Sequence, residues 1–359
     1  MKNFSKSLPV LHIRLFPAFH SRPLRGHSLP GRGLIGRCRA GASVASLTIT
    51  YTKNGENMSE KCVYALGFFD GVHLGHGSLL KACRELADEL GVAAGVVTFS
   101  SHPDALVQGA APGLINTLED RDLLLREQYH MNRIITLPFD RAMMETTWQD
   151  FFRRLVEEFS AAGIVCGEDF RFGHRGLGDG SKLLAACREA GIPCIIVPQQ
   201  QLGGVTVSST HIRDLIEMGY VEQANRFLGH PHILTGKVVP GHQLGRRLGF
   251  PTANLLLPEE LAVPKFGVYA CRCLVDGCFY GAVTNVGTRP TVAGMGITIE
   301  TWILDYSGDL YGQDITLEFL KFLRPEIRFP TLTDLQAAVR ADAEKTKEIL
   351  TSFSTGPWD

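Results

Sequence analysis

The stretch GFFDGVHLGHGSLL, from Gly67 to Leu80, connects an apolar run to an amphipathic run through a turn rich in glycine. The apolar run, VYALGFF, is typical of a buried strand. The amphipathic run, SLLKACRELADELG, has apolar residues at helical spacing and ends at Gly91, a residue type that favours helix ends. Two histidines, His73 and His76, stand between the two runs. A strand, a turn and a helix in this order predict the first unit of a parallel α/β sheet.

The same alternation of apolar and amphipathic runs continues up to Gly229. Further strands are predicted at 92–99, 133–139, 164–170 and 192–198, with helices at 118–129, 146–163 and 181–191. We therefore expect a Rossmann-like parallel sheet, whose ligands bind beyond the carboxyl ends of the strands. The turn with the two histidines follows one strand, and the segment GEDFRFGHRGLGD (167–179) follows another. Both are therefore candidate ligand loops.

The pattern changes at Gly229 and Pro231, and we place a domain boundary there, between 58–229 and 230–359. Strand-like runs then follow one another through Gly, Pro and Asp turns, at 233–239, 268–275, 279–287, 298–306 and 315–323. Consecutive short strands of this kind predict an antiparallel β-barrel. The run 331–350 predicts a closing helix, with Thr333 and Gln336 spaced as a capping box.

The composition excludes several classes of partner. Of the 359 residues, 20% are charged and 45% hydrophobic, with a formal net charge of −1, so neither nucleic acid nor a membrane is an expected partner. No apolar run approaches the roughly 20 residues that span a bilayer. The nine cysteines are scattered, and the only cluster, Cys271, Cys273 and Cys278, lacks the partners of a zinc site. Buried thiols in a reducing cytoplasm fit better.

The first 57 residues differ from the rest, because arginines stand among Ser, Gly and Pro and no acidic residue precedes Glu56. This segment does not bury enough surface to fold. We expect a mis-assigned start, with translation beginning at Met58, since GENM (55–58) can be encoded with a purine-rich ribosome-binding site. An organellar transit peptide, which has this composition, and a genuine disordered tail are the alternatives.

The histidine turn has the features of a phosphate site. A helix N-terminus offers unpaired N–H groups and a positive dipole end, and Gly71, Gly75 and Gly77 let a triphosphate approach the backbone. Imidazoles at His73 and His76 can stabilise the charge on a departing pyrophosphate. A loop with solvated histidines is the alternative, whereas a metal site lacks further ligands.

A second phosphate-type element is VSSTHIR, from Val207 to Arg213. Hydroxyls and the arginine fork both hold phosphate oxygens. The same Ser/Ser/Thr run is also a good helix N-cap, and the sequence leaves both interpretations open.

The second half has no Walker loop, but GHQLGRRLGFPTANL (241–255) joins a Gly/Arg loop to a PTAN turn. Its glycines would let N–H groups reach phosphates, and the Thr252 hydroxyl could ligate Mg²⁺. The alternative is an ordinary turn with a solvated basic patch. Glu300, within the strand-like IETWILDY, could act as a general base if burial raises its pKa, or could instead pair with an arginine.

These motifs carry a resemblance to known families. GFFDGVHLGH with SSTHIR resembles the HxGH and ISSTxIR signatures of nucleotidyltransferases, and TFSSHP (98–103) with GEDFRFGHRGLGD looks like the prokaryotic FAD synthetase module. The resemblance implies that His73 and His76 contact ATP phosphates and that Asp169 helps hold the nucleotide and flavin phosphate. It implies this set of ATP-binding residues: Phe69, Asp70, His73, Gly75, His76, Asp169, Ser209, Thr210 and Arg213.

The second half is similar to riboflavin kinases in GRRLGFPTANL, TNVGTRPT, IETWILDY, DLYGQ and FLRPEIRF, which occur in the family's order. The resemblance implies a six-stranded barrel in which Thr252 and Asn254 organise Mg²⁺ and ATP and Glu300 is the base for the riboflavin 5′-hydroxyl. It implies these further ATP- or flavin-binding residues: Gly245, Arg246, Gly249, Asn285 and Arg324.

The two resemblances together predict a bifunctional enzyme. The barrel would convert riboflavin and ATP to FMN, and the α/β half would convert FMN and a second ATP to FAD and pyrophosphate. Flavoproteins are the possible recipients of the FAD. A one-step enzyme with one decayed half, and a flavin-sensing protein without turnover, are the alternatives.

Overall fold

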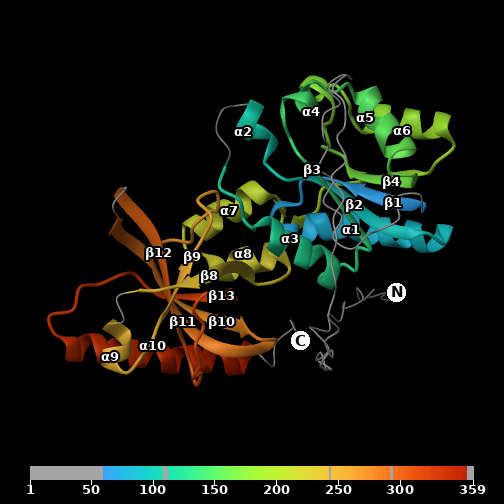
Figure 1. Cartoon of the computed structure of the whole chain (residues 1–359). Coiled ribbons are helices and arrows are strands. Elements are labelled where there is room, and N and C mark those ends of the chain that lie inside the picture. The colour runs from blue at the N-terminus through green and yellow to red at the C-terminus, as the bar shows by residue number, and fades with distance from the viewer. Residues whose placement is uncertain (1–59, 108–111, 242–243, 292–293, 354–359) are drawn as a thin grey trace, which may run out of the picture.

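The structure is a computed structural model that describes residues 60–107, 112–241, 244–291 and 294–353. The prediction for the first 57 residues lies outside the described residues. Within them the chain forms a parallel-sheet half and a barrel half, which are in contact (Figure 1).

The first half is built on a five-stranded sheet in the order β3-β2-β1-β4-β5. Every neighbouring pair of strands is parallel, as predicted. The strands are β1 (Cys62–Leu66), β2 (Ala93–Phe99), β3 (Arg133–Leu137), β4 (Ala161–Gly167) and β5 (Cys194–Val197).

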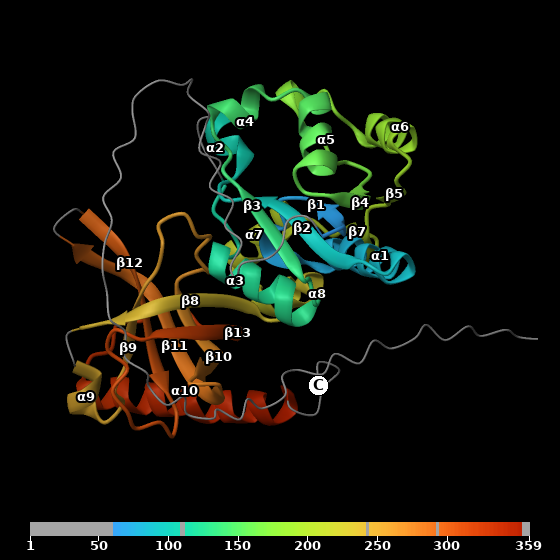
Figure 2. The ribbon, with the colours of Figure 1, turned by 45° about the vertical axis from the view of Figure 1, so that its right-hand side comes forward.

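Helices cover both faces of this sheet, which explains its nearly continuous apolar strands (Figure 2). One face packs against α1 (Leu74–Leu90) and the π-helical turn η2 (Leu124–Gln128), which continues α3 (Leu118–Leu123). The other face packs against α5 (Trp148–Glu157) and α6 (Gly180–Ala190).

Several predicted boundaries in this half are wrong. Helix α1 begins at Leu74 rather than Ser78, so His76 lies in its first turn and only His73 precedes it. Residues 161–163, predicted as the end of a helix, belong to β4. The structure adds these short elements: η1 (Asp70–Val72), α2 (Pro103–Val107), α4 (Arg141–Glu145), η3 (His174–Gly176), β6 (Gln201–Leu202) and β7 (Val205–Thr206). Helices α7 (Ser209–Glu217) and α8 (Val221–Leu228) lead to the barrel.

The second half is a closed antiparallel barrel in the order β10-β11-β12-β9-β8-β13. Its strands are β8 (His232–Val239), β9 (Ala253–Leu256), β10 (Gly267–Val275), β11 (Cys278–Thr291), β12 (Gly294–Ile303) and β13 (Asp314–Arg324). The barrel is therefore confirmed, but β9 was missed because ANLL followed a segment interpreted as a turn. The predicted Gly/Arg loop contains the short helix α9 (Leu244–Leu248).

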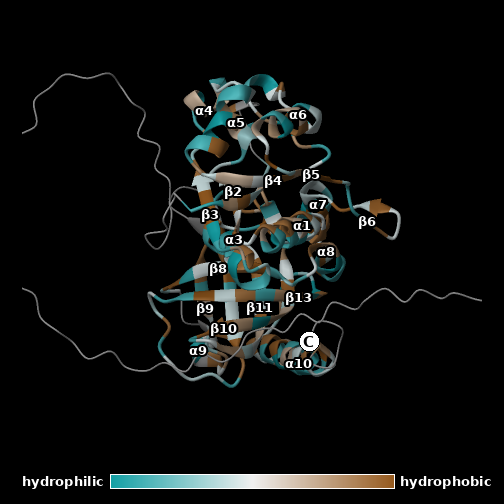
Figure 3. Ribbon diagram, turned by 90° about the vertical axis from the view of Figure 1, so that its right-hand side faces the viewer, coloured by the Kyte–Doolittle hydropathy of each residue, from teal (hydrophilic) through white to brown (hydrophobic). Residues whose placement is uncertain are grey.

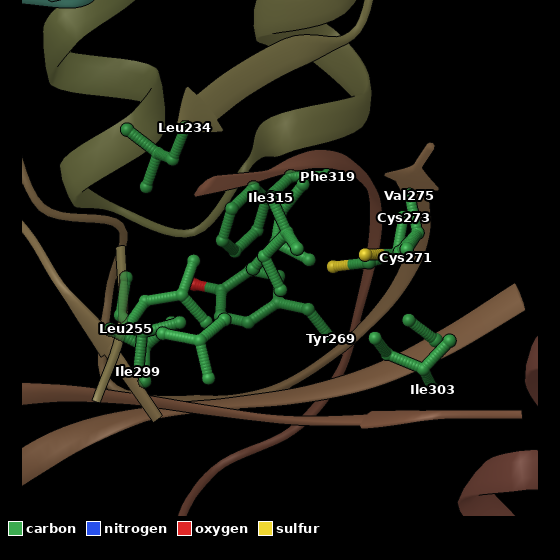
Figure 4. Packing of buried hydrophobic residues seen from close by; sticks show 14 of the residues in the cluster. Leu234, Leu255, Tyr269, Cys271, Cys273, Val275, Ile299, Ile303, Ile315 and Phe319 are labelled. Atoms are coloured by element: carbon green, nitrogen blue, oxygen red, sulfur yellow. The ribbon is translucent and has the colours of Figure 1, made fainter. Parts of the chain in front are cut away.

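Alternate residues of the strands fill the barrel with one apolar core (Figure 4). Cys271 and Cys273 both point into it and are fully buried. The eight cysteines of the described residues are free thiols. Six are buried, as predicted, whereas Cys194 is half-buried and Cys278 is exposed.

Helix α10 (Leu332–Phe353) lies along the outside of the barrel (Figure 2). The predicted capping box at Thr333 and Gln336 is wrong. The Asp334 N–H donates to Thr331 Oγ1 at 3.1 Å, whereas Gln336 Nε2 donates to the Leu248 carbonyl at 3.0 Å and ties α10 to α9. The cap therefore stands two residues earlier.

Figure 3 shows that the helices carry hydrophilic residues on their outer surface over hydrophobic strands. In the parts of the chain that the structure describes, no helix has the length and apolar character needed to cross a membrane.

Candidate active sites

The first candidate site, the histidine site, lies where β1 leads into α1. His73 is the N-cap of α1, and its Nδ1 accepts the His76 N–H at 3.2 Å. The two imidazole rings stack, with centroids 3.6 Å apart and an interplanar angle of 11°. His73 therefore caps the N-terminus of α1 with Nδ1, and this bond leaves its other ring nitrogen, Nε2, free of the helix.

Burial keeps both rings neutral near pH 7. It lowers the pKa of His73 to about 4, with the nearby His230 adding to the effect and Asp169 opposing it. The pKa of His76 is also well below its usual value, first through burial and then through the charges of His73 and Arg121. Because Nδ1 of His73 accepts a hydrogen bond, the proton of its neutral ring sits on Nε2, which is a donor for a phosphate oxygen.

The frame behind the histidines is an ion pair between Asp70 and Arg213. Arg213 Nη2 donates to Asp70 Oδ2 at 3.1 Å, and both side chains are buried. Burial raises the pKa of Asp70, against the Ile115 hydrogen bond and the charge of Arg213. Arg213 Nε also donates to the Gly113 carbonyl at 2.6 Å. Much of the arginine fork is therefore engaged with protein.

The Ser/Ser/Thr run could be a phosphate-binding element or a helix N-cap, and the structure shows that it caps a helix. Ser208 is the N-cap of α7 and accepts the His211 N–H at 3.3 Å, while Ser209 Oγ donates to the Asp70 carbonyl at 2.9 Å. Thr210 is exposed. The run thus joins α7 to the histidine turn, and it leaves Thr210 as the exposed hydroxyl of the motif.

The remaining residues of this half fall into two groups. Phe69 is fully buried, in a left-handed backbone conformation (φ 59°), with its ring 5.1 Å from that of His76. Gly75 stands beside the His73 ring, where a Cβ would lie 3.1 Å from Cε1. Asp169 is exposed and accepts from Gln199 Nε2 at 3.0 Å. Phe69 therefore supports the histidines from the core, while Asp169 faces them from the loop after β4.

Sequence reasoning missed two residues at this site. Arg121 of α3 is buried, and its charge acts on Asp70, His76 and His102. His102, which was quoted within TFSSHP but given no role, lies edge-on to the Phe68 ring with centroids 4.8 Å apart. Arg121 sits in a helix so rich in charge that its burial has no signal in the sequence.

The second candidate site, the barrel site, is centred on Glu300 of β12. In the strand register Glu300 lies opposite Asn254 of β9 on one side and Asn285 of β11 on the other. Ile299 next to it is buried in the barrel core, so this row of three polar residues faces outward. Asn285 Nδ2 donates to Glu326 Oε1 at 3.1 Å. The sheet thus gathers on one face residues that are far apart in the sequence.

Two cavities meet at this site. One, of about 370 Å³, lies between the outer face of the barrel and α10, and its walls include Glu300, Asn285, Phe250, Trp302 and Arg324. The other, of about 490 Å³, includes Arg246 and residues of the segment 306–311. Thr252 lines both. A flat apolar molecule in the first cavity and a polyanion in the second would therefore meet at Thr252.

Arg324 and the glycines of the barrel site have protein partners or packing reasons. Arg324 pairs with the buried Asp342 of α10, with Nη2 2.8 Å from Oδ2. This ion pair ties the end of β13 to the helix. Gly245 is buried where a Cβ would lie 2.4 Å from the Phe250 carbonyl oxygen. Gly249 has a φ of +86° and open space around it. Arg324 and Gly245 therefore help to hold α10 and α9, respectively, beside the cavity.

The donor set for a metal ion is small. Among the described residues no group of three or more His, Cys, Asp or Glu could hold one. Asn254 Oδ1 is buried and has no hydrogen-bond partner within the described parts, and Thr252 supplies a hydroxyl. Hard oxygen ligands of this kind, few in number, fit Mg²⁺ that is held mainly by phosphates and water.

Two family models match successive parts of the chain. Residues 55–211 match the family described as FAD synthetase, and residues 228–350 match the family described as riboflavin kinase.

Individual relatives match over most of their length. A bifunctional riboflavin kinase/FMN adenylyltransferase of Haemophilus influenzae is 34% identical over 305 residues, which are 83% of this chain and 97% of the relative. One from Escherichia coli K12 is 35% identical over 292 residues, with 80% and 93% covered. A crystal structure described as a macrolide-efflux protein from Streptococcus pneumoniae superposes with a TM-score of 0.73 at 30% identity, covering 80% of this chain and 94% of the other.

Proposed function

The chain belongs to the family of bifunctional riboflavin kinases/FMN adenylyltransferases, and from this premise we propose how its residues divide the chemistry. The enzyme transfers the γ-phosphoryl group of ATP to riboflavin, giving FMN and ADP. It then transfers the AMP moiety of a second ATP to FMN, giving FAD and pyrophosphate. We assign the first step to the barrel, at 230–359, and the second to the α/β half, at 58–229.

In the barrel we propose Glu300 as the general base. Its carboxylate takes the proton of the riboflavin 5′-hydroxyl while that oxygen attacks the γ-phosphorus and ADP leaves in line. Asn285 and Asn254 flank Glu300 in the register and position the alcohol and phosphate. This arrangement, with Glu300 on the wall of one cavity and Thr252 shared with the next, carries the proposal. Gly245, Arg246, Gly249 and Arg324 complete the ATP and flavin pockets.

Thr252 Oγ1 and Asn254 Oδ1 would hold Mg²⁺ together with ATP, because both are hard oxygen donors and the second is an orphaned buried acceptor. When bound, Mg²⁺ neutralises charge that develops on the phosphates.

In the α/β half we propose that His73 and His76 donate hydrogen bonds to the pyrophosphate as it leaves the α-phosphorus under attack by an FMN phosphate oxygen. His73 Nε2–H is oriented for this by its own N-cap bond. His73 donates as a neutral ring, because its Nδ1 is occupied as the acceptor of the His76 N–H. For His76 the negative charge of the triphosphate also favours protonation of the ring, which strengthens its donation. Asp169 and Thr210 face the ligand, while Asp70, Ser209 and Arg213 brace the turn, and Phe69 and Gly75 shape it.

We further propose that the enzyme acts in the cytoplasm, where free thiols persist, and that its FAD passes to flavoproteins.

The test is incubation of the full-length chain with riboflavin, ATP and Mg²⁺, followed by chromatography of the flavins. We expect FMN first and FAD afterwards. Accumulation of FMN alone, or FAD only from supplied FMN, would indicate a decayed half. Tight flavin binding without consumption of ATP would indicate a sensing protein instead.

A further inference from the structure

Arg121 joins two turns of the adenylyltransferase site that are separate in the sequence. Its Nη1 donates to the Phe68 carbonyl at 2.5 Å and its Nη2 to the Phe99 carbonyl at 2.9 Å. Phe68 belongs to the turn that leads to His73, and Phe99 is the last residue of β2, ahead of His102. One buried guanidinium therefore bridges the two turns, beside the Thr98 hydroxyl of β2, which donates to the same Phe68 carbonyl at 2.9 Å.

The same side chain sets the aromatic contacts of the site. The guanidinium lies over the Phe68 ring, 4.6 Å from its centroid, and the edge-on contact between Phe68 and His102 continues the stack. The guanidinium thus contacts the ends of both strands, β1 and β2. A change at Arg121 would therefore move both turns at once.

The residue before Arg121 points toward the outer face of the barrel strand β8. Asp120 is buried, with Oδ1 accepting from Thr235 Oγ1 at 2.5 Å and Oδ2 accepting from the Thr235 N–H at 3.2 Å. Thr235 is on β8, 115 residues away in the chain, and its hydroxyl also contacts Thr316 Oγ1 of β13 at 2.7 Å. Neighbouring residues on a helix point about 100° apart, so Arg121 of α3 can bond to the parallel-sheet half while Asp120 bonds to the barrel.

We propose that Arg121 is a positioning residue for adenylyl transfer and that the barrel holds it in place through the Asp120–Thr235 contact. The kinase half thereby supplies part of the mechanical support of the other site. This inference rests on the proposed function, since it assumes that adenylyl transfer takes place beside His73 and His76.

The physical reason is the precision that in-line transfer requires. A displacement of about 1 Å in a reacting group can cost about 10²-fold in rate. Arg121 contributes two hydrogen bonds from a rigid planar fork, whereas lysine keeps the charge but not the fork. Loss of the Thr235 hydroxyl leaves Asp120 with one donor fewer in a buried place, which loosens α3 without touching the site.

The experiment measures FAD formation from FMN and FMN formation from riboflavin in the same full-length samples. For Arg121→Gln we expect kcat for FAD formation to fall about 10²-fold, with KM for ATP changed less than about threefold, and for Arg121→Lys to recover about tenfold of that loss. The rate of FMN formation serves as the measure of how much folded enzyme each sample contains. A merely structural role would lower both activities together. Arg121→Lys would then form FAD no faster than Arg121→Gln.

The barrel contact is tested with Thr235→Val, and Thr316→Val is its matched control. Both variants lose the hydroxyl pair between β8 and β13, but only the first loses the bond to Asp120. We expect Thr235→Val to lower kcat for FAD formation about three- to tenfold, with kinase turnover unchanged, and Thr316→Val to alter neither rate. Equal effects of the two substitutions would overturn the barrel's part in the proposal.

A third variant separates failure of this inference from failure of the proposed function. If His73→Ser abolishes FAD formation while both Arg121 variants leave it intact, the inference is wrong and the site assignment stands. If His73→Ser also leaves FAD formation intact, the site itself is misplaced.

Discussion

The two proposed active sites of this chain are built in opposite ways. At the adenylyltransferase site several motif residues are buried or half-buried and bonded to one another: His73 caps α1, Ser209 holds the histidine turn, and Asp70 pairs with Arg213. At the kinase site Glu300 and Asn285 stand partly exposed on the outer face of a barrel whose stability comes from a core on the other side of the same strands.

The difference teaches that a motif residue can serve chemistry alone or chemistry and folding together. Substitution at the kinase site removes a reactive group from a surface that the barrel does not need. Substitution at the adenylyltransferase site also removes a cap or leaves a buried charge unpaired, and breaking a buried pair costs about 3–5 kcal/mol. The ratio of lost activity to lost stability should therefore distinguish the two sites.

The largest effect is expected for Glu300→Gln. If Glu300 is the general base, as proposed, FMN formation should fall by about 10²- to 10⁴-fold, because this is the usual contribution of general base catalysis. FAD formation from supplied FMN, and the melting temperature, should stay close to those of the unchanged enzyme. Steady-state assays of both steps with calorimetry check this. Loss of both activities in a protein that melts normally would contradict the division of labour.

The next effect is expected at His73, where activity and stability can be separated. His73→Ala should slow FAD formation by about 10²-fold or more, as loss of a preorganised donor does, and should cost about 1 kcal/mol of stability through the lost N-cap. His73→Ser keeps a capping oxygen and should recover the stability without the activity. If serine and alanine melt at the same temperature, the N-cap of α1 does not matter.

The element order of both halves could be predicted from the sequence, because apolar periodicity directly reflects which face of each element is buried. The predictions of secondary structure failed where tertiary contacts, rather than the local sequence, determine the element. β9 was hidden because PTAN has turn composition, yet Asn254 pairs in register with Glu300. The cap of α10 fell on Thr331, since Gln336 was taken by the Leu248 carbonyl.

The same limit applies to the sites. Residue types and spacing named His73, His76 and Glu300, but not the partners that restrict them. Asp70 and Arg213 are 143 residues apart, and periodicity contains nothing that joins them. Arg121 was invisible for a related reason: an arginine among acidic residues of a short helix looks solvated until the carbonyls that bury it are known.

A smaller effect is expected for Asp342→Asn, which tests whether α10 is a wall of the flavin cavity. The Arg324–Asp342 pair ties α10 to the end of β13. Loosening it should raise KM for riboflavin about tenfold, roughly 1.4 kcal/mol of binding, while kcat changes less. Lys321→Gln, which breaks the exposed pair with Glu222, is the control and should change neither constant. A fall in kcat alone would argue against a role for α10 in binding.

The smallest effect leaves both rates at neutral pH unchanged and appears only in acid. Four histidines around the proposed adenylyltransferase site have lowered pKa values: His73, His76, His102 and His230, whose Nε2 contacts the Gly71 carbonyl. On the described barrel strands the pKa of His232 is lowered as well. Burial is the main cause at each of them.

The sign follows from proton uptake. Between pH 6.5 and about 4 an unfolded chain protonates His73 more than the folded one does, so stability is complete above pH 6.5 and falls as the pH drops toward 4. The loss from His73 is up to about 3 kcal/mol. After a pulse of an acid-active protease at each pH, which removes the unfolded half before return to neutral pH, FAD formation should therefore be lost at a higher pH than FMN formation. Loss of both at one pH would mean that the two halves unfold together, which the Asp120–Thr235 contact could impose, and Thr235→Val should then separate the two midpoints.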